Sequence, residues 1–216
     1  CRQRLDDVAA ILKRFRQAVL AAATSGELTG EWRVERNREQ DWESSSIKSI
    51  ADVGTGSTPL RSNQSFYSLD GMPWITSAAT SEELITTANE FVTESGIKAG
   101  RLRTFPEGTL LVAMYGEGKT RGQVSELGIE ATINQACAAI HSPREQHLMP
   151  FIKIALRANY LEMRQLAEGG NQPNLNLSKI KDFPIRVPPK DEVFEICYQV
   201  ESLFSLADQL EAKLTA

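Results

Sequence analysis

The octapeptide AMYGEGKT, at Ala113–Thr120, has the composition of a loop that binds nucleotide phosphates. A Walker A loop ends in Gly-Lys-Thr and follows a strand, and the apolar run 109–112 precedes this one. Its chemistry also needs a helix that starts at the Lys-Thr pair, because the helix amides hold the phosphates. Here Gly122 falls in the required first turn and a β-type pattern follows. The sequence therefore favours a glycine-rich β-turn over an ATP site.

A second catalytic pattern overlaps this loop. Glu107, Glu117 and Lys119 imitate the carboxylate–carboxylate–lysine set of metal-dependent nucleases. A single predicted strand separates the two glutamates, which places them roughly 25 Å apart at about 3.3 Å per residue, too far to share a metal. The sequence offers no convincing catalytic constellation, so we expect a protein that is not an enzyme and has no catalytic residues.

The cysteines and histidines give little support for a metal site. Cys1, Cys137 and Cys197 are odd in number and widely spaced, which is typical of reduced thiols in a cytoplasm. Cys137, His141 and His147 offer three zinc ligands, but ordinary packing is the simpler explanation, and we expect no metal. No apolar run approaches about 18 residues, so no transmembrane helix is expected.

Three loops instead carry clusters of basic or amide side chains: Lys119 and Arg121 among glycines, a second cluster of Asn171, Gln172, Asn174 and Asn176, and a third around Arg61. Asn174 and Asn176 alternate with Leu175 and Leu177, so a structural role is the alternative for these two. Arginine can pair with guanine and asparagine or glutamine with adenine, so these loops are candidates for contact with DNA. The net charge of −4 does not indicate a nucleic-acid binder, although a balanced middle of the chain leaves room for a basic face. Solvated loops with local turns remain the alternative for each. The candidate residues are Ser57, Thr58, Arg61, Asn63, Gln64, Tyr67, Lys119, Thr120, Arg121, Asn171 and Gln172.

The elements that must carry these loops begin and end with helices. Apolar residues spaced by three and four predict long helices over 1–25 and 190–216, each on the order of 30–40 Å. The alternative is two helices packed on a globular core. The predicted seam residues are Leu5, Val8, Leu12, Phe15, Val19 and Ala22 in the first helix, and Val193, Ile196, Val200, Leu203, Ala207, Leu210 and Leu214 in the second.

Between the helices the pattern is mixed. Short strands are predicted at 46–53, 73–76, 109–115, 122–126, 132–140 and 183–187. A single helix is predicted at 148–167, where apolar side chains fall on one face. The predicted fold class is α+β, a mixed α/β domain flanked by two long antiparallel coiled-coil helices.

Five segments of the chain resemble, in order, the specificity subunits of type I restriction-modification systems. They are LKRFRQAVLAAATSGELTGEW (12–32), DVGTGSTP (52–59), GTLLVAMYGEGKTRGQV with INQACAAI (108–124 and 133–140), and GGNQPNLNLSKIKDFPIRVPPKDE (169–192). The hairpin tip departs from the family's usual Gly-Thr-Ile-Gly-Lys, and Arg186 stands where an apolar residue or proline is common. The recognised DNA sequence is therefore left open.

The resemblance implies half of the family's architecture. A spacer helix would occupy 1–25, a connector 26–46, a DNA-binding target-recognition domain 47–189 and a second spacer helix 190–216. Such a chain would read one half of a gapped site in double-stranded DNA and dock methyltransferase and restriction subunits, which carry the adenine methylation and the ATP-driven cleavage. It implies no cofactor, no membrane and a cytoplasmic location. Two copies pairing through the helices are a further expectation, and a helical assembly module without DNA specificity is the alternative.

Overall fold

The structure is a computed structural model that divides into two compact units. It describes residues 2–116, 120–142, 144–168 and 175–215. A helical unit comprises Cys1–Ser44, Pro150–Ala158 and Arg186–Ala216. An α+β unit comprises Ser45–Met149 and Asn159–Ile185.

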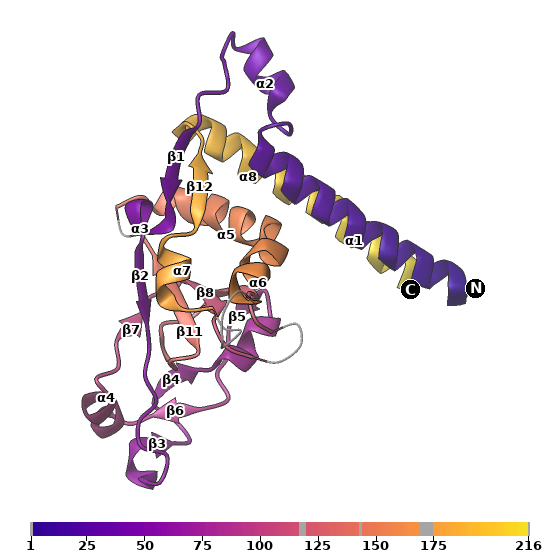
Figure 1. Cartoon of the computed structure of the whole chain (residues 1–216). Helices are drawn as coiled ribbons and strands as arrows, with labels where there is room; N and C mark the ends of the chain where they lie inside the picture. Colours follow the sequence, from indigo (N-terminus) through magenta and orange to yellow (C-terminus); the bar gives the residue numbers. More distant parts are fainter. Residues whose placement is uncertain (1, 117–119, 143, 169–174, 216) are drawn as a thin grey trace. The chain divides into compact units, whose positions relative to one another are not determined.

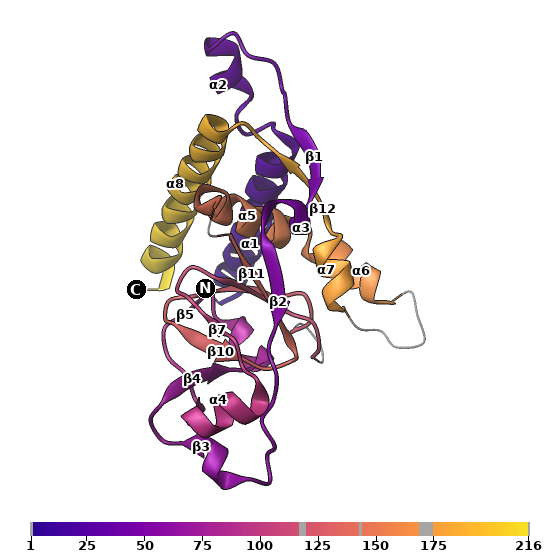
Figure 2. The same cartoon turned by 90° about the vertical axis from the view of Figure 1, so that its left-hand side faces the viewer.

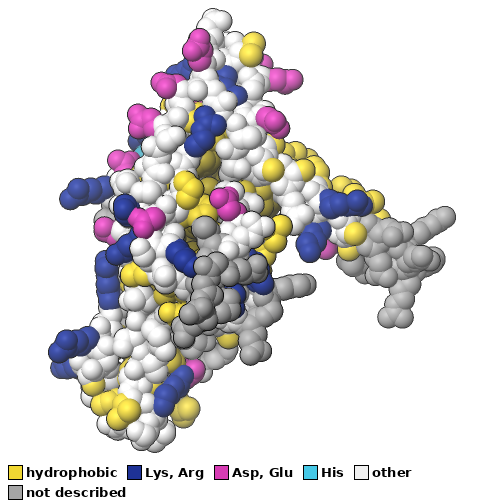
Figure 3. Space-filling view, viewed as in Figure 1, with side chains coloured by type: hydrophobic (Ala, Val, Ile, Leu, Met, Phe, Trp, Pro, Cys, Tyr) yellow, Lys and Arg dark blue, Asp and Glu magenta, His cyan; other side chains and the backbone are white. Residues whose placement is uncertain are grey.

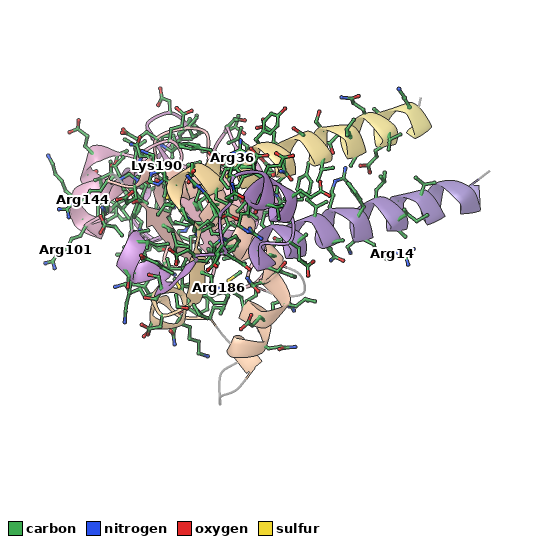
Figure 4. The ribbon with its side chains drawn as sticks, turned by 90° about the horizontal axis from the view of Figure 1, so that it is seen from above. Arg14, Arg36, Arg101, Arg144, Arg186 and Lys190 are labelled. Atoms are coloured by element: carbon green, nitrogen blue, oxygen red, sulfur yellow. The ribbon has the colours of Figure 1, made fainter. Side chains whose placement is uncertain are left out.

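Two long helices dominate the helical unit. α1 (Arg2–Ser25) and α8 (Lys190–Thr215) lie within the bounds that the sequence predicts. They run antiparallel and side by side, with the first residues of α1 beside the last residues of α8 (Figures 1 and 4). Asp191 and Glu192 occupy the first turn of α8, where acidic side chains favour the helix dipole. The unit also contains α2 (Gly30–Glu35) and nearly all of α5 (Met149–Ala158).

Part of the predicted seam is buried between these helices. Leu12, Val19, Val193, Ile196, Val200 and Ala207 are buried, and Val8, Ala22 and Leu203 are half-buried. Phe15 and Leu210 are 38% and 53% exposed, so they do not take part in the buried seam. The side chains of Leu5 and Leu214 lie outside the described residues.

The α+β unit contains two five-stranded sheets of mixed direction. The first has the order β2 (Asp52–Thr55), β11 (Cys137–His141), β8 (Leu110–Ala113), β9 (Val124–Leu127) and β5 (Leu84–Ile85). The second has the order β3 (Tyr67–Ser68), β6 (Phe91–Val92), β4 (Met72–Ile75), β10 (Ala131–Ile133) and β7 (Thr104–Phe105). Only the β5–β9 and β4–β10 pairs are parallel among the pairings described for these two sheets.

Helical segments accompany the two sheets, and two further strands pair with each other. Figure 2 shows β3 and α4 toward one end of the α+β unit and α7 toward the other. The helices are α3 (Ile47–Ile50), α4 (Glu94–Gly100), α6 (Tyr160–Glu168) and α7 (Leu177–Lys181). The 3-10 turns are η1 (Gln64–Phe66), η2 (Ser77–Ser81) and η3 (Gln146–Leu148). The paired strands are β1 (Glu43–Ser46) and β12 (Pro184–Val187).

Apolar side chains from both sheets form one core. The run that precedes the Walker-like loop becomes β8, which is buried along its whole length, as a continuous apolar run predicts. A second, smaller cluster of Trp74, Val92 and Leu102 packs with Ile97 of α4. The larger cluster contains Ile75, Ile85, Phe105, Leu111, Leu127, Ala131, Ile133, Cys137 and Ala139.

Two strands predicted as continuous are interrupted. Residues 132–140 form β10 and β11 in different sheets, because Asn134 starts a turn in which its Oδ1 accepts a hydrogen bond from the Ala136 amide at 3.0 Å. Residues 46–53 contain the single helical turn α3, closed by the Ala51 amide donating to the Ile47 carbonyl. Both predictions of one strand were wrong.

The helix predicted over 148–167 is two helices. α5 ends at Ala158, and α6 starts after Asn159, a residue of low helix propensity whose carbonyl accepts the Met163 amide. The break also separates the two units, because α5 groups with the helical unit and α6 with the α+β unit. Across the described helices, none is both long and apolar enough to cross a membrane.

Candidate nucleic-acid interface

The turn that carries Ser57 and Thr58 is fastened to the connection between β10 and β11. The Ser57 amide donates to the Ile133 carbonyl at 3.1 Å, and the Thr58 hydroxyl donates to the Gln135 side chain. Gly56 makes this approach possible: a Cβ atom there would lie 1.7 Å from the Ile133 carbonyl oxygen. The glycine-rich turn is therefore required for the position of both candidate residues.

Arg61 lies in a stacked cluster that the sequence did not foresee in full. Its guanidinium lies over the rings of Trp74 (4.6 Å) and Tyr67 (4.9 Å), and it hydrogen-bonds both carboxylate oxygens of Glu90, one of them at 3.2 Å. These hydrogen bonds raise the pKa of Arg61, while burial raises the pKa of Tyr67. The indole of Trp74 donates to the Ser57 carbonyl, which brings this cluster next to the fastened turn.

The polar neighbours of Arg61 make local hydrogen bonds. Asn63 Oδ1 accepts from the Ser65 amide (3.1 Å) and hydroxyl (2.7 Å), and so caps η1. The Tyr67 hydroxyl donates to the Pro59 carbonyl at 2.6 Å. The structure therefore brings the candidates between Ser57 and Tyr67 into one region. Several of their polar atoms already form hydrogen bonds that hold the loop in its conformation.

The tip of the β8–β9 hairpin is the second candidate loop. Lys119 lies outside the described residues, whereas Thr120 and Arg121 are described. No helix begins at Thr120; a turn leads into β9 at Val124, as the sequence predicts. This arrangement does not provide the helix N-terminus that a Walker A loop requires.

Arg121 has a neighbour that sequence reasoning missed. Arg164 of α6 donates to the Arg121 carbonyl at 3.2 Å and hydrogen-bonds the Tyr160 hydroxyl at 3.1 Å. Two arginines therefore meet at the base of this hairpin. The i, i+4 spacing of Tyr160 and Arg164 is visible in the sequence, but their contact with a residue more than forty positions away is not.

The third candidate loop, with Asn171 and Gln172, lies outside the described residues. Directly after it, Leu175 is buried, and Asn176 caps α7 by accepting a hydrogen bond from the Lys179 amide at 2.9 Å. The asparagine at 176 thus has the structural role that its alternation with leucines allowed.

Exposed basic side chains are found along one edge of the α+β unit. Figure 3 shows Lys and Arg side chains gathered there over α4 and β7, with few acidic ones beside them. Lys98, Arg101 and Arg103 lie in this segment and are exposed. Arg101 and Arg144 extend outward from the unit in Figure 4. Composition alone did not reveal this edge, because the acidic and basic residues between positions 47 and 189 are equal in number.

The residues considered for zinc do not converge. Cys137 and His141 lie at opposite ends of β11, and His147 lies 3.4 Å from Glu145. In the described ranges, no group of three His, Cys, Asp or Glu side chains is arranged to hold a metal ion. Burial raises the pKa of the Cys137 thiol to about 12 and that of Cys197 to about 11, and both thiols are free.

The family model for the type I restriction modification DNA specificity domain matches residues 39–216. The chain belongs to this family.

Among its relatives, the specificity subunit of the type I restriction enzyme EcoDI from Escherichia coli is 30% identical over 98% of this chain and 50% of that protein. The MjaIX specificity subunit from Methanocaldococcus jannaschii is 29% identical over 71% of this chain and 35% of that protein. The chain spans about half the length of the curated relatives that it matches from end to end.

Solved structures show the same fold. The S subunit of a type I restriction-modification system from M. genitalium has a TM-score of 0.67 at 15% identity, and the match covers 99% of this chain and 54% of that subunit. The HsdS subunit from Thermoanaerobacter tengcongensis has a TM-score of 0.62 at 16% identity and covers 98% of this chain and 54% of its own. The predicted α+β class with flanking helices is confirmed.

Proposed function

We propose that this chain recognises one half of a gapped site in double-stranded DNA, as the specificity subunit or half of it in a type I restriction-modification complex. The observation that carries the proposal is the family match, which includes the whole α+β unit and α8. The chain itself performs no chemistry in this proposal. Methyltransferase subunits methylate adenine, and restriction subunits cleave DNA with ATP.

Sequence readout is assigned to the loops of the α+β unit. The stacked Arg61 cluster and the fastened turn at Ser57 and Thr58 form one contact region, and the hairpin with Lys119, Thr120 and Arg121 forms a second. Asn171 and Gln172 are proposed as a third. Lys98, Arg101 and Arg103 supply positive charge for the phosphate backbone, which positions a protein without reading sequence.

The helix pair is assigned to assembly. Ile11 (53% exposed) and Phe15 (38%) on α1, and Leu206 (56%) and Leu210 (53%) on α8, are apolar side chains exposed to solvent. Figure 3 shows hydrophobic side chains along this pair. Such a surface fits a second pair of helices. Docking of methyltransferase subunits and pairing of two copies of this chain both use it in the proposal, and two copies would read a gapped palindrome.

A helical assembly module without DNA specificity is the second candidate function. The same exposed apolar residues favour it, since they indicate association whether or not the α+β unit binds DNA. The two candidates differ in what the loops do.

The deciding experiment is selection from a random duplex library with this chain and its methyltransferase partner. The proposal predicts enrichment of a short motif, repeated at a fixed gap if two copies pair. A stable complex that enriches no motif would remove DNA recognition and leave the assembly module. A metal- or ATP-dependent activity of the pure chain would contradict the assignment of all chemistry to partner subunits.

A further inference from the structure

The connection between α1 and β1, residues 26–42, is tied to the end of α1. We name these residues the strap; it contains α2. Arg33 Nη2 donates to the Gly26 carbonyl at 2.6 Å, and Gln40 Nε2 donates to the Ser25 carbonyl at 2.7 Å. The last carbonyls of a helix lack partners within the helix, so these two side chains cap the C-terminus of α1.

The same arginine is also tied to the start of α8. Arg33 Nη1 forms an ion pair with Glu192 and donates to the Thr29 hydroxyl at 2.9 Å, and that hydroxyl donates to Glu192 at 2.7 Å. Thr29, Glu192 and Arg33 are 0%, 2% and 9% exposed, so the network is closed off from water. One guanidinium therefore joins the C-terminus of α1 to the N-terminus of α8. Each charge lies at the helix end that it favours.

The apolar seam alone gives little reason for one register of α1 against α8. Its residues repeat every seven positions, and it includes the small residue Ala207. A slip by one heptad would again place apolar side chains opposite apolar ones. It would move Arg33 from Glu192 by about 10 Å at about 1.5 Å per residue, and so leave a buried charge unpaired. Fixing register is the best-attested use of a buried polar pair between helices.

The other ion pairs described between α8 and either α1 or the strap are exposed. Arg16 bonds to Asp208 (2.6 Å) and Glu211 (2.7 Å), whose side chains are 69% and 48% exposed. Arg38 of the strap pairs with Asp191, and both side chains are about half exposed. Exposed pairs contribute little, because water screens them and their side chains lose freedom. The buried network is therefore the contact that distinguishes one register from another.

We propose that Arg33 and Glu192 are positioning residues that fix the register of α1 against α8, and through it the gap between the two half-sites that an assembly reads. The statement about the gap rests on the proposed function; the statement about register does not. A heptad slip of about 10 Å corresponds to about three base pairs, at about 3.4 Å per pair. Loss of the network should therefore change the gap in steps of this size and leave the half-site motif unchanged.

The register is tested by the distance between spin labels at Lys13 and Gln209, on the exposed sides of α1 and α8. The full chain carries Cys1→Ser and Cys197→Ala, and labelled copies are diluted with unlabelled ones. We expect one distance in the parent chain, and a second population at a different distance in Arg33→Met and in the milder Glu192→Gln; because the labels face each other across the helix pair, this distance changes by less than the slip itself. Arg38→Met removes an exposed pair from the same strap to the same turn of α8 and should keep one distance. A single unchanged distance in both Arg33→Met and Glu192→Gln would overturn the proposal.

The gap is tested by repeating the duplex selection with Glu192→Gln and Arg38→Met. We expect Glu192→Gln to enrich the parent motif at additional gaps that differ by about three base pairs, and Arg38→Met to keep the parent gap. A second spin-label distance with an unchanged gap would overturn the link between register and DNA. If the parent chain enriches no motif, the proposed function fails, while the label distances still decide whether the network fixes the register.

Discussion

At the scale of single residues, Gly56 determines where the first candidate loop lies. A methyl group at this position would meet the Ile133 carbonyl at 1.7 Å, so the turn would have to move away from the β10–β11 connection. We expect Gly56→Ala to lower the free energy of unfolding by about 3 kcal/mol or more. Gly54→Ala is the matched control, because the nearest atoms would lie at 3.6 Å, an ordinary contact. Equal denaturation midpoints for the two variants would contradict this explanation of the turn.

Lys119 and Arg121 supply the positive charge of the hairpin loop. If both contact phosphates, Lys119→Ala with Arg121→Ala should weaken binding to the selected duplex and reduce the salt dependence of log K by a slope of about 2. Lys13→Ala, on α1, is the control, because it removes one positive charge from the helical unit. Fluorescence anisotropy at several salt concentrations measures both slopes. An unchanged affinity and sequence preference in the double variant would exclude this loop from the interface.

The buried thiol of Cys137 makes the free energy of unfolding depend on pH in the alkaline range. Burial raises its pKa in the folded protein from 9.0 to about 12. The folded state therefore keeps the thiol proton where the unfolded state loses it, and stability falls as pH rises from 9.0 toward about 12. Cys137→Ala should flatten this fall in urea denaturation measured across that range, compared with the parent chain. The same slope in both proteins would show that other groups cause it.

At the scale of elements, the two faces of the helix pair have different roles. Ile196 is fully buried, so Ile196→Ala should lower the free energy of unfolding by about 2–5 kcal/mol. Leu210 is 53% exposed, and Leu210→Glu should change the stability of one chain by only about 0.5 kcal/mol. The exposed substitution should instead reduce self-association in sedimentation experiments at micromolar concentration. Gln209→Glu adds the same charge at the neighbouring exposed position and should leave association intact.

The long elements were the most predictable from sequence. The bounds of α1 and α8 follow from apolar periodicity over many turns, and β8 follows from an uninterrupted apolar run. Breaks at Asn134 and Asn159 were missed, because one asparagine within an apolar pattern is a weak local signal that tertiary packing decides. The helix α2 within the strap was also missed, since six residues carry too little periodicity.

The candidate site was predictable in composition but not in geometry. Arg61 and Tyr67 were singled out as polar loop residues, but the stacking of Arg61 on Trp74 and the edge-to-face contact of Tyr67 with Trp74 depend on contacts between segments that only the fold brings together. The same holds for Arg164 beside the hairpin and for Arg33 with Glu192, which are 159 positions apart. Residue type indicated where recognition is plausible, and long-range contacts decide which polar atoms are already engaged.

At the scale of the whole molecule, the chain has about half the length of the relatives that it matches. If two copies together form one reader, joining them by a flexible linker should make binding to the selected gapped site independent of self-association. The expected gain in apparent affinity at low concentration is about 100-fold or more. The parent chain at the same concentration of recognition units is the control. No gain, with the linked protein folded, would indicate that one copy reads the site alone.

The placement of α5 has a consequence for genetic recombination. Its chain neighbours belong to the α+β unit, but its buried side chains, including Phe151 packed edge-on against Trp42, belong to the helical unit. A crossover that replaces residues 45–185 with those of a relative, to acquire a new DNA specificity, would also import a foreign α5. The imported α5 would then have to pack against the recipient's helical unit. Exchanges between relatives should therefore succeed where the apolar face of α5 agrees, however much the loops differ.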